Sequence, residues 1–146
     1  PEADAIAMAA AVADHRLAQP FAHKPEKAAL ASALQQGWQA VPDLLVELVE
    51  RRPKGQRILG FAAHSGDVLP QAQAKFLRKG CDLLFANPID RAGAGFGSDA
   101  NEGWLLGPDH EIIRFEPMGK LALAHQLLTA LRPQELPLLH RSAKDP

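Results

Sequence analysis

The 146-residue sequence has no tyrosine, and aromatic residues make up only 5% of it. It contains one cysteine, Cys81, so an internal disulfide and any metal site built from several cysteines are excluded. In the stretch KGCDLLFAN we expect this cysteine to pack as a small hydrophobe.

The sequence also lacks long apolar runs and a charge excess of one sign. No run approaches the roughly 18 apolar residues of a membrane span, and PEADAIAMAAAVADHR has no basic region before its alanines, so no secretory signal is predicted. The sequence has sixteen basic and seventeen acidic residues, so it has no overall positive charge that would attract nucleic acid or an anionic membrane. We therefore expect a cytoplasmic protein with no nucleic-acid or membrane partner, in which any anion site is local.

Two common catalytic arrangements are missing as well. The six histidines show no metal-ligand spacing and no HExxH pattern occurs, which argues against zinc. Ser65 stands in HSGD without the GxSxG context of a nucleophilic serine. The composition, 47% hydrophobic and 23% charged, is that of a protein that folds, and the length corresponds to one domain.

Hydrophobic patterning predicts an alternation of helices and strands. Strands are expected at 5–13, 57–63 and 82–87, helices at 42–52, 68–79 and 118–131, and a hairpin from 104–106 and 111–115. The alanine-rich first segment leaves a helix open as an alternative. The order predicts an α/β fold with a Rossmann-like parallel sheet flanked by helices and a β-hairpin extension near the C-terminus.

Outside these elements we expect two less regular segments. Residues 17–41 have poor periodicity and prolines at Pro20 and Pro25, which is typical of a long loop that acts as a lid. Residues 1–132 are expected to form the domain, and 133–146 a loosely ordered tail. Because the chain begins at Pro1 just before a strand, we expect a front part to be missing.

The predicted parallel sheet places polar residues together, because ligands bind beyond the carboxyl ends of its strands. Asp14, residues 62–67 and residues 87–99 fall at this edge. Lys75 and Lys79 lie four residues apart on one helix face, so both ammonium groups can reach one polyanion, although such lysines are more often merely solvated.

Further candidates have equally open alternatives. Asp14 could bind Mg²⁺ or a ribose hydroxyl, or it could only stabilise a turn. The glycines at 93, 95 and 97 allow close backbone approach to a ligand, or form a plain loop. Lys24 and Lys27 on the expected lid can close over a phosphoryl group, or remain in solvent.

Six motifs occur in an order that resembles one enzyme family: AAVADHR, PEK, PDLL, GFAA, KFLRKGCDLLFAN and GFGSDAN. The sequence is similar, over residues 3–131, to phosphopantothenoylcysteine synthetase, also called phosphopantothenate cysteine ligase. This enzyme is the C-terminal half of a bifunctional bacterial coenzyme A biosynthesis flavoprotein.

The resemblance implies a ligase that joins 4'-phosphopantothenate to L-cysteine with CTP as co-substrate and Mg²⁺ as cofactor, through an acyl-cytidylate. It also implies a homodimer, to which the alanine-rich strand or the hairpin strands would contribute. FMN belongs to the decarboxylase domain, which this sequence does not contain. The glycine-rich first half of the ligase, with its substrate-binding asparagine, is absent too.

The resemblance also implies roles for individual residues. Lys27 corresponds to the catalytic lysine of a flap. The nucleotide would contact Ala10 and Asp14 (the latter near ribose or metal), the backbone of Pro42, Asp43, Leu44 and Leu45, the ring of Phe61, and, through its phosphates, Lys75 and Lys79.

Three departures from the family pattern leave alternatives open. Leu30 stands where a second flap lysine is common, with Lys24 as a possible substitute, and His64 replaces an acid that usually follows GFAA. One alternative is a non-catalytic nucleotide-binding or dimerisation fragment. Another is an ATP-using relative of the ligase, which the sequence does not distinguish from a CTP-using one.

Overall fold

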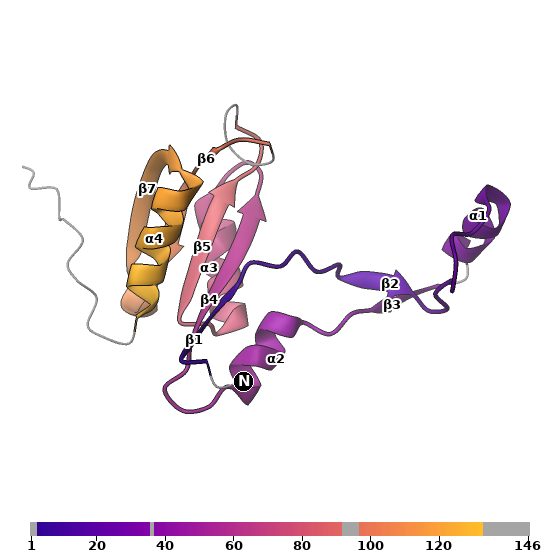
Figure 1. Cartoon of the computed structure of the whole chain (residues 1–146), viewed down its shortest axis with the longest axis horizontal. Helices are drawn as coiled ribbons and strands as arrows, with labels where there is room; N and C mark the ends of the chain where they lie inside the picture. The colour runs from indigo at the N-terminus through magenta and orange to yellow at the C-terminus, as the bar shows by residue number, and fades with distance from the viewer. Residues whose placement is uncertain (1–2, 36, 92–96, 133–146) are drawn as a thin grey trace, which may run out of the picture.

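The computed structural model describes residues 3–35, 37–91 and 97–132 of the chain. Its body is a five-stranded sheet in the order β1-β4-β5-β6-β7, as Figure 1 shows. The strands are β1 (Ala5–Met8), β4 (Arg57–His64), β5 (Leu83–Pro88), β6 (Ala100–Leu106) and β7 (Ile112–Gly119). The predicted α/β class is therefore confirmed.

The sheet is parallel at one side and antiparallel at the other. β1 pairs in parallel with β4, and β4 with β5, whereas β6 and β7 are antiparallel to their neighbours. The predicted hairpin is confirmed with longer strands, and its turn contains the short 3₁₀ helix η1 (Pro108–His110). Asp109 and His110 both have positive φ in this tight reversal.

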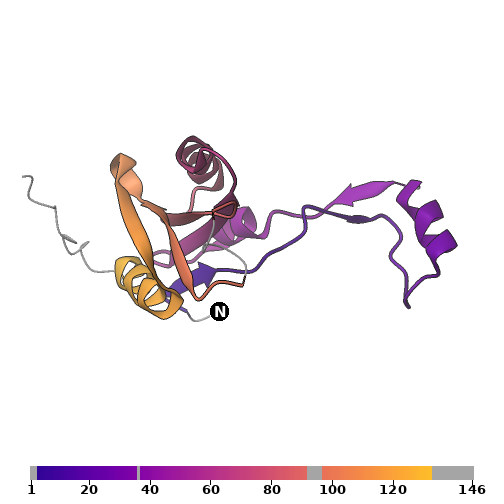
Figure 2. The same ribbon diagram turned by 90° about the horizontal axis from the view of Figure 1, so that it is seen from above.

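Helices cover both faces of the sheet and close two apolar cores. Helices α2 (Leu44–Arg51) and α3 (Val68–Lys79) pack with one face, and α4 (Lys120–Leu131) packs with the other (Figures 1 and 2). The first core contains Cys81, which is buried as predicted. The second is built around Phe85, whose ring makes edge contacts with Phe61 and Phe115.

The helix ends follow local sequence signals. Asp43 is the N-cap of α2 and its Oδ1 accepts a hydrogen bond from the amide of Val46, so the helix begins at Leu44, two residues later than the proline suggested. Leu44, the first residue of the helix, is consequently exposed, whereas Leu45 is buried. Gly80 ends α3 with φ of 64°, as expected of a left-handed C-cap.

The largest error of the sequence prediction concerns residues 17–41, which are not a structureless loop. They include α1 (Lys27–Gln35) and the end of a two-stranded antiparallel ribbon, β2 (His15–Leu17) with β3 (Trp38–Ala40). Figures 1 and 2 show this arm, residues 9–41, projecting from the body with α1 at its far end. Elements this short that do not pack on an apolar core carry little periodicity to detect.

Other boundaries also differ from the prediction. The first strand ends at Met8 rather than at Ala13, and the last helix starts at Lys120 rather than at Met118. The predicted tail at 133–146 and the glycines at 93 and 95 lie outside the described residues. In the described part of the chain, no helix has the length and apolarity needed to cross a bilayer.

We expect Gly103→Ala to destabilise the fold strongly. A β-carbon at Gly103 would lie 2.2 Å from the carbonyl oxygen of Ala86 and 2.8 Å from Cζ of Phe85, and the backbone atom cannot move aside without disturbing the β5–β6 pairing. Thermal unfolding should show a loss of about 3 kcal/mol. The control is Gly119→Ala, where no atom lies within 4 Å. Equal melting temperatures of the two variants would contradict this packing.

Candidate functional site

A cavity of about 230 Å³ opens beyond the carboxyl end of β1. It lies where the chain leaves the sheet for the arm and returns from it to α2, so residues distant in sequence meet there. Nine of the residues predicted to form the site line this cavity: Ala10, Asp14, Pro42, Asp43, Leu44, Leu45, Phe61, Lys75 and Lys79. Met8, Val12, Ala13 and Val41 complete the lining and were not predicted.

The strand register explains why a cavity forms here. The last residue of β1, Met8, pairs with Gly60, while β4 continues to His64. The side of β4 above Gly60 is therefore not covered by β1, and Phe61 lines the cavity at this step. On the other side, the backbone of Asp14 accepts a hydrogen bond from Val41, which ties the two arm strands together at the cavity mouth.

Some predicted positions do not reach this cavity. Lys27 is the first residue of α1, and Figures 1 and 2 place that helix far from the sheet. Residues 62–67 and Asn87 lie at the carboxyl ends of β4 and β5 and do not line the cavity. There, Asp90 accepts a hydrogen bond from the amide of Gly66 and closes the loop before α3. The site is thus centred on the end of β1 rather than spread along the whole edge.

Asp43 joins the two helices beside the cavity. While its Oδ1 caps α2, its Oδ2 accepts a hydrogen bond from the ammonium of Lys79 in an ion pair. The side chain of Lys79 is only 11% exposed, so this charge is partly desolvated and requires a partner. Burial raises the pKa of Asp43, but the hydrogen bond from Lys79 and that from the Val46 amide outweigh it and the pKa is lowered.

Lys75 lies one turn before Lys79 and has a different electrostatic setting. Burial lowers the pKa of Lys75, and the charges of Lys79 and Arg78 lower it further. The carboxylates of Asp14 and Asp43 act in the opposite direction, which shows that both lie within electrostatic range of this ammonium. The cavity wall is therefore a cluster of two lysines and two carboxylates, in which an anion would relieve the repulsion between the lysines.

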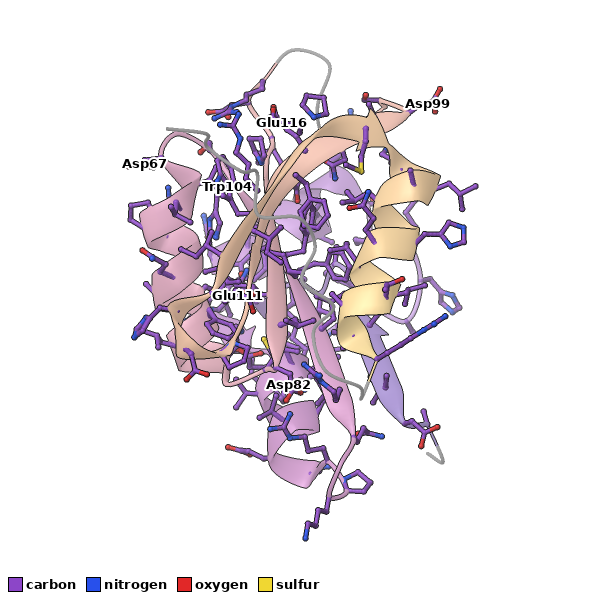
Figure 3. All side chains as sticks on the ribbon, turned by 90° about the vertical axis from the view of Figure 1, so that its left-hand side faces the viewer. Asp67, Asp82, Asp99, Trp104, Glu111 and Glu116 are labelled. Carbon is purple, nitrogen blue, oxygen red and sulfur yellow. The ribbon has the colours of Figure 1, made fainter. Side chains whose placement is uncertain are left out.

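The opposite end of the sheet has a structural rather than a ligand-binding arrangement. Figure 3 shows Asp67 and Asp99 at one end and Asp82 at the other. Asp82 pairs with Arg52 at 2.5 Å and accepts a hydrogen bond from the Ile58 amide at 2.7 Å, which anchors the start of β4. This pair could not be predicted from sequence, because its two residues lie thirty positions apart and no motif contains them.

Comparisons with known proteins give consistent results. The family described as "DNA/pantothenate metabolism flavoprotein C-terminal domain" matches residues 1–134. The chain is 38% identical, over 148 aligned residues, to the "Coenzyme A biosynthesis bifunctional protein CoaBC" of Mycobacterium tuberculosis strain H37Rv, covering 90% of this chain and 33% of that protein. It is 34% identical to the Bacillus subtilis protein of the same name, with 86% and 30% covered.

Among solved structures, the chain is similar to the C-terminal domain of a coenzyme A biosynthesis bifunctional protein CoaBC. The TM-score is 0.61 with 28% sequence identity, and the match covers 86% of this chain and 53% of that one. The chain thus spans about a third of the length of the curated relatives and about half of this solved domain.

We expect Asp43→Asn to separate the two roles of Asp43. Asparagine is as good an N-cap as aspartate, so α2 should persist and stability should fall by about 1 kcal/mol or less, the value of a partly exposed ion pair. The lost negative charge should strengthen binding of inorganic tripolyphosphate to Lys79 several-fold. Titration calorimetry checks this, with Glu47→Gln, in the first turn of the same helix, as control. Weaker binding by Asp43→Asn would contradict the competition.

Proposed function

The chain belongs to the DNA/pantothenate metabolism flavoprotein C-terminal domain family, and from this premise we propose that it is part of a ligase that joins 4'-phosphopantothenate to L-cysteine. This activity would place it in coenzyme A biosynthesis, in agreement with the names of its relatives. The family assignment made from the six ordered motifs is confirmed by the match to residues 1–134.

The observation that carries the proposal is the pairing of Lys75 and Lys79 on the wall of the cavity that also contains Asp14. Two partly buried cations one helical turn apart suit the phosphates of a nucleoside triphosphate. The amides of Leu44 and Leu45 precede the first intrahelical hydrogen bonds of α2, so they are available to polar atoms of a base. We propose CTP as the nucleotide, with Phe61 against it.

The reaction would proceed in two steps. A carboxylate oxygen of 4'-phosphopantothenate attacks the α-phosphorus of CTP; the new O–P bond forms while the α–β phosphoanhydride bond breaks and pyrophosphate leaves. The amine of cysteine then attacks the acyl carbon, an amide bond forms, CMP departs with the bonding electrons, and the amine loses a proton to solvent. Lys75 and Lys79 would hold the phosphates in line and neutralise charge during the first step.

The side chains in this cavity could hold Mg²⁺ only together with the phosphates of a bound substrate. The described residues contain no group of three or more histidine, cysteine, aspartate or glutamate side chains that could hold a metal. Mg²⁺ is commonly held by one or two carboxylates together with substrate phosphates, which corresponds to Asp14 beside a bound triphosphate. Bound in this way, Mg²⁺ would supply charge neutralisation at the phosphate oxygens. We propose Asp14 as its protein ligand.

The arm would contribute Lys27 and the contact between two copies. Phe21, Leu30, Leu34 and Trp38 of the arm are apolar and between 41% and 54% exposed, which favours a partner surface. We propose a homodimer formed through the arm, in which Lys27 approaches the cavity when the reactants are bound. A second candidate function, nucleotide binding without catalysis, is favoured because no residue of α1 lines the cavity and Figure 1 shows this helix far from the sheet.

Pyrophosphate release tests the proposed function. The chain with 4'-phosphopantothenate, cysteine, Mg²⁺ and CTP is expected to release pyrophosphate and to form the amide product, more slowly with ATP.

Lys27→Ala should lower the rate by about a hundredfold with little change in CTP affinity. Light scattering on the same sample should give the mass of a dimer. CTP binding without turnover would support the non-catalytic candidate instead.

Replacement of the paired lysines should weaken nucleotide binding. Lys75→Ala and Lys79→Ala should each reduce CTP affinity about tenfold or more, since each removes a charge-assisted contact worth about 1.5–3 kcal/mol. CMP, with one phosphate, should be affected less. Lys54→Ala, an exposed lysine in the turn that leads to β4, serves as the control in equilibrium dialysis. Unchanged CTP affinity in both cavity variants would refute the phosphate assignment.

A further inference from the structure

His64 is the last residue of β4 and lies beside the cavity without lining it. Side chains alternate along a strand, so His64 shares the sheet face of Ile58 and Ala62, which pack in the core beneath α2 and α3. Its backbone carbonyl accepts a hydrogen bond from Ile89, which fixes the strand end. The side chain therefore faces α3, the helix that carries both lysines of the proposed site.

The imidazole has one ring nitrogen that is buried and unsatisfied. Nε2 of His64 has no hydrogen-bond partner among the residues that the structure describes. A buried polar atom without a partner costs free energy, so such an atom in a native protein calls for a ligand, a water or another explanation. An oxyanion would satisfy Nε2 if the imidazole were protonated, because the protonated ring has a donor on each nitrogen.

The charged groups near His64 come from two elements, α3 and the segment after β5. Lys75 faces it from α3, Asp67 is the N-cap of that helix, and Asp90 holds the Gly66 amide from the segment after β5. Burial lowers the pKa of His64 and the ammonium of Lys75 lowers it further, whereas a hydrogen bond with the Gln71 side chain raises it. An anion that neutralised Lys75 would therefore favour protonation of the ring.

The helix spacing aligns His64 with the two lysines. Gln71, Lys75 and Lys79 lie at intervals of four and share one face of α3. The side-chain nitrogen of Gln71 donates to the carbonyl oxygens of Ser65 and Asp67, both at 3.0 Å, and the same side chain makes a hydrogen bond with the imidazole of His64, which holds His64 against this face of α3. His64 therefore follows Lys79 and Lys75 in a row that runs toward the carboxyl end of β4. A polyanion bound by the two lysines would extend along this row to His64.

We propose that His64 is the third cationic position of a phosphate row formed with Lys75 and Lys79, and that it makes polyphosphate binding stronger as the pH falls. The inference rests on the proposed nucleotide site and assigns to it a residue that binds the far end of the triphosphate. A nucleoside monophosphate is too short to use the whole row, so His64 would discriminate by phosphate number.

The direction of the pH effect follows from linkage. A bound polyphosphate raises the pKa of His64 relative to the free chain, so binding takes up a proton. The gain in affinity is complete at pH values below the pKa of the free chain and is lost as the pH rises through the pKa of the complex. The triphosphate itself titrates in this range, so the effect has to be measured against a variant that lacks the imidazole.

The test compares wild type with His64→Gln and His64→Lys by equilibrium dialysis of CTP and CMP, between about pH 5.5 and about pH 8. The CTP affinity of wild type relative to His64→Gln should rise on the order of fivefold to tenfold toward low pH, with a smaller change for CMP. His64→Lys, with a fixed charge, should bind CTP tightly across the whole range. His125→Gln, on the exposed side of α4 at the other sheet face, should behave as wild type.

The outcomes separate this inference from the proposed function. If wild type and His64→Gln show the same pH dependence while Lys75→Ala still weakens CTP binding, the role of His64 is refuted and the nucleotide site stands. If His64→Lys binds CTP no better than His64→Gln at about pH 8, the row is also refuted. If wild type binds no CTP at any pH, both proposals fall.

Discussion

The repulsion between Lys75 and Lys79 is the constraint around which the candidate site is arranged. Two ammonium groups one turn apart in a partly desolvated position are unfavourable unless negative charge is supplied nearby. Asp43 supplies it directly to Lys79, and Asp14, which lines the same cavity, favours the charged form of Lys75. This balance connects the ends of α2 and α3 with the residues that follow β1. A polyanion would add to it more charge than the two carboxylates provide.

The sheet provides the frame for this cluster. Because β1 stops beside Gly60 while β4 continues, the lysines and the start of α2 face a step in the sheet rather than a closed core. The step is also where the chain departs into the arm and returns. One short strand therefore determines both the cavity and the origin of the arm, whose exposed apolar residues and Lys27 are the parts of the proposed mechanism that lie away from the cavity.

The body of the fold could be predicted from sequence because its elements carry strong local signals. The bounds of α3, its glycine cap and the buried strands β4 and β5 follow from periodicity and composition. The arm could not, since its three-residue strands and its short alanine-rich helix belong to neither apolar core and carry no detectable periodicity. Nine of the ten predicted site residues line one cavity, and Lys27 does not. Tertiary contacts determine two further features, the ion pair of Asp43 with Lys79 and the unpaired Nε2 of His64, so neither could be predicted from a sequence motif.

The proposed function requires this cavity to hold a nucleoside triphosphate with its phosphates along α3. A crystal structure of the chain with CTP and Mg²⁺ would show whether it does. We expect the cytosine near the start of α2, the phosphates in contact with Lys75 and Lys79, and the terminal phosphate nearest His64. CTP bound elsewhere on the chain, or bound in the cavity with its phosphates directed away from α3, would refute the nucleotide assignment.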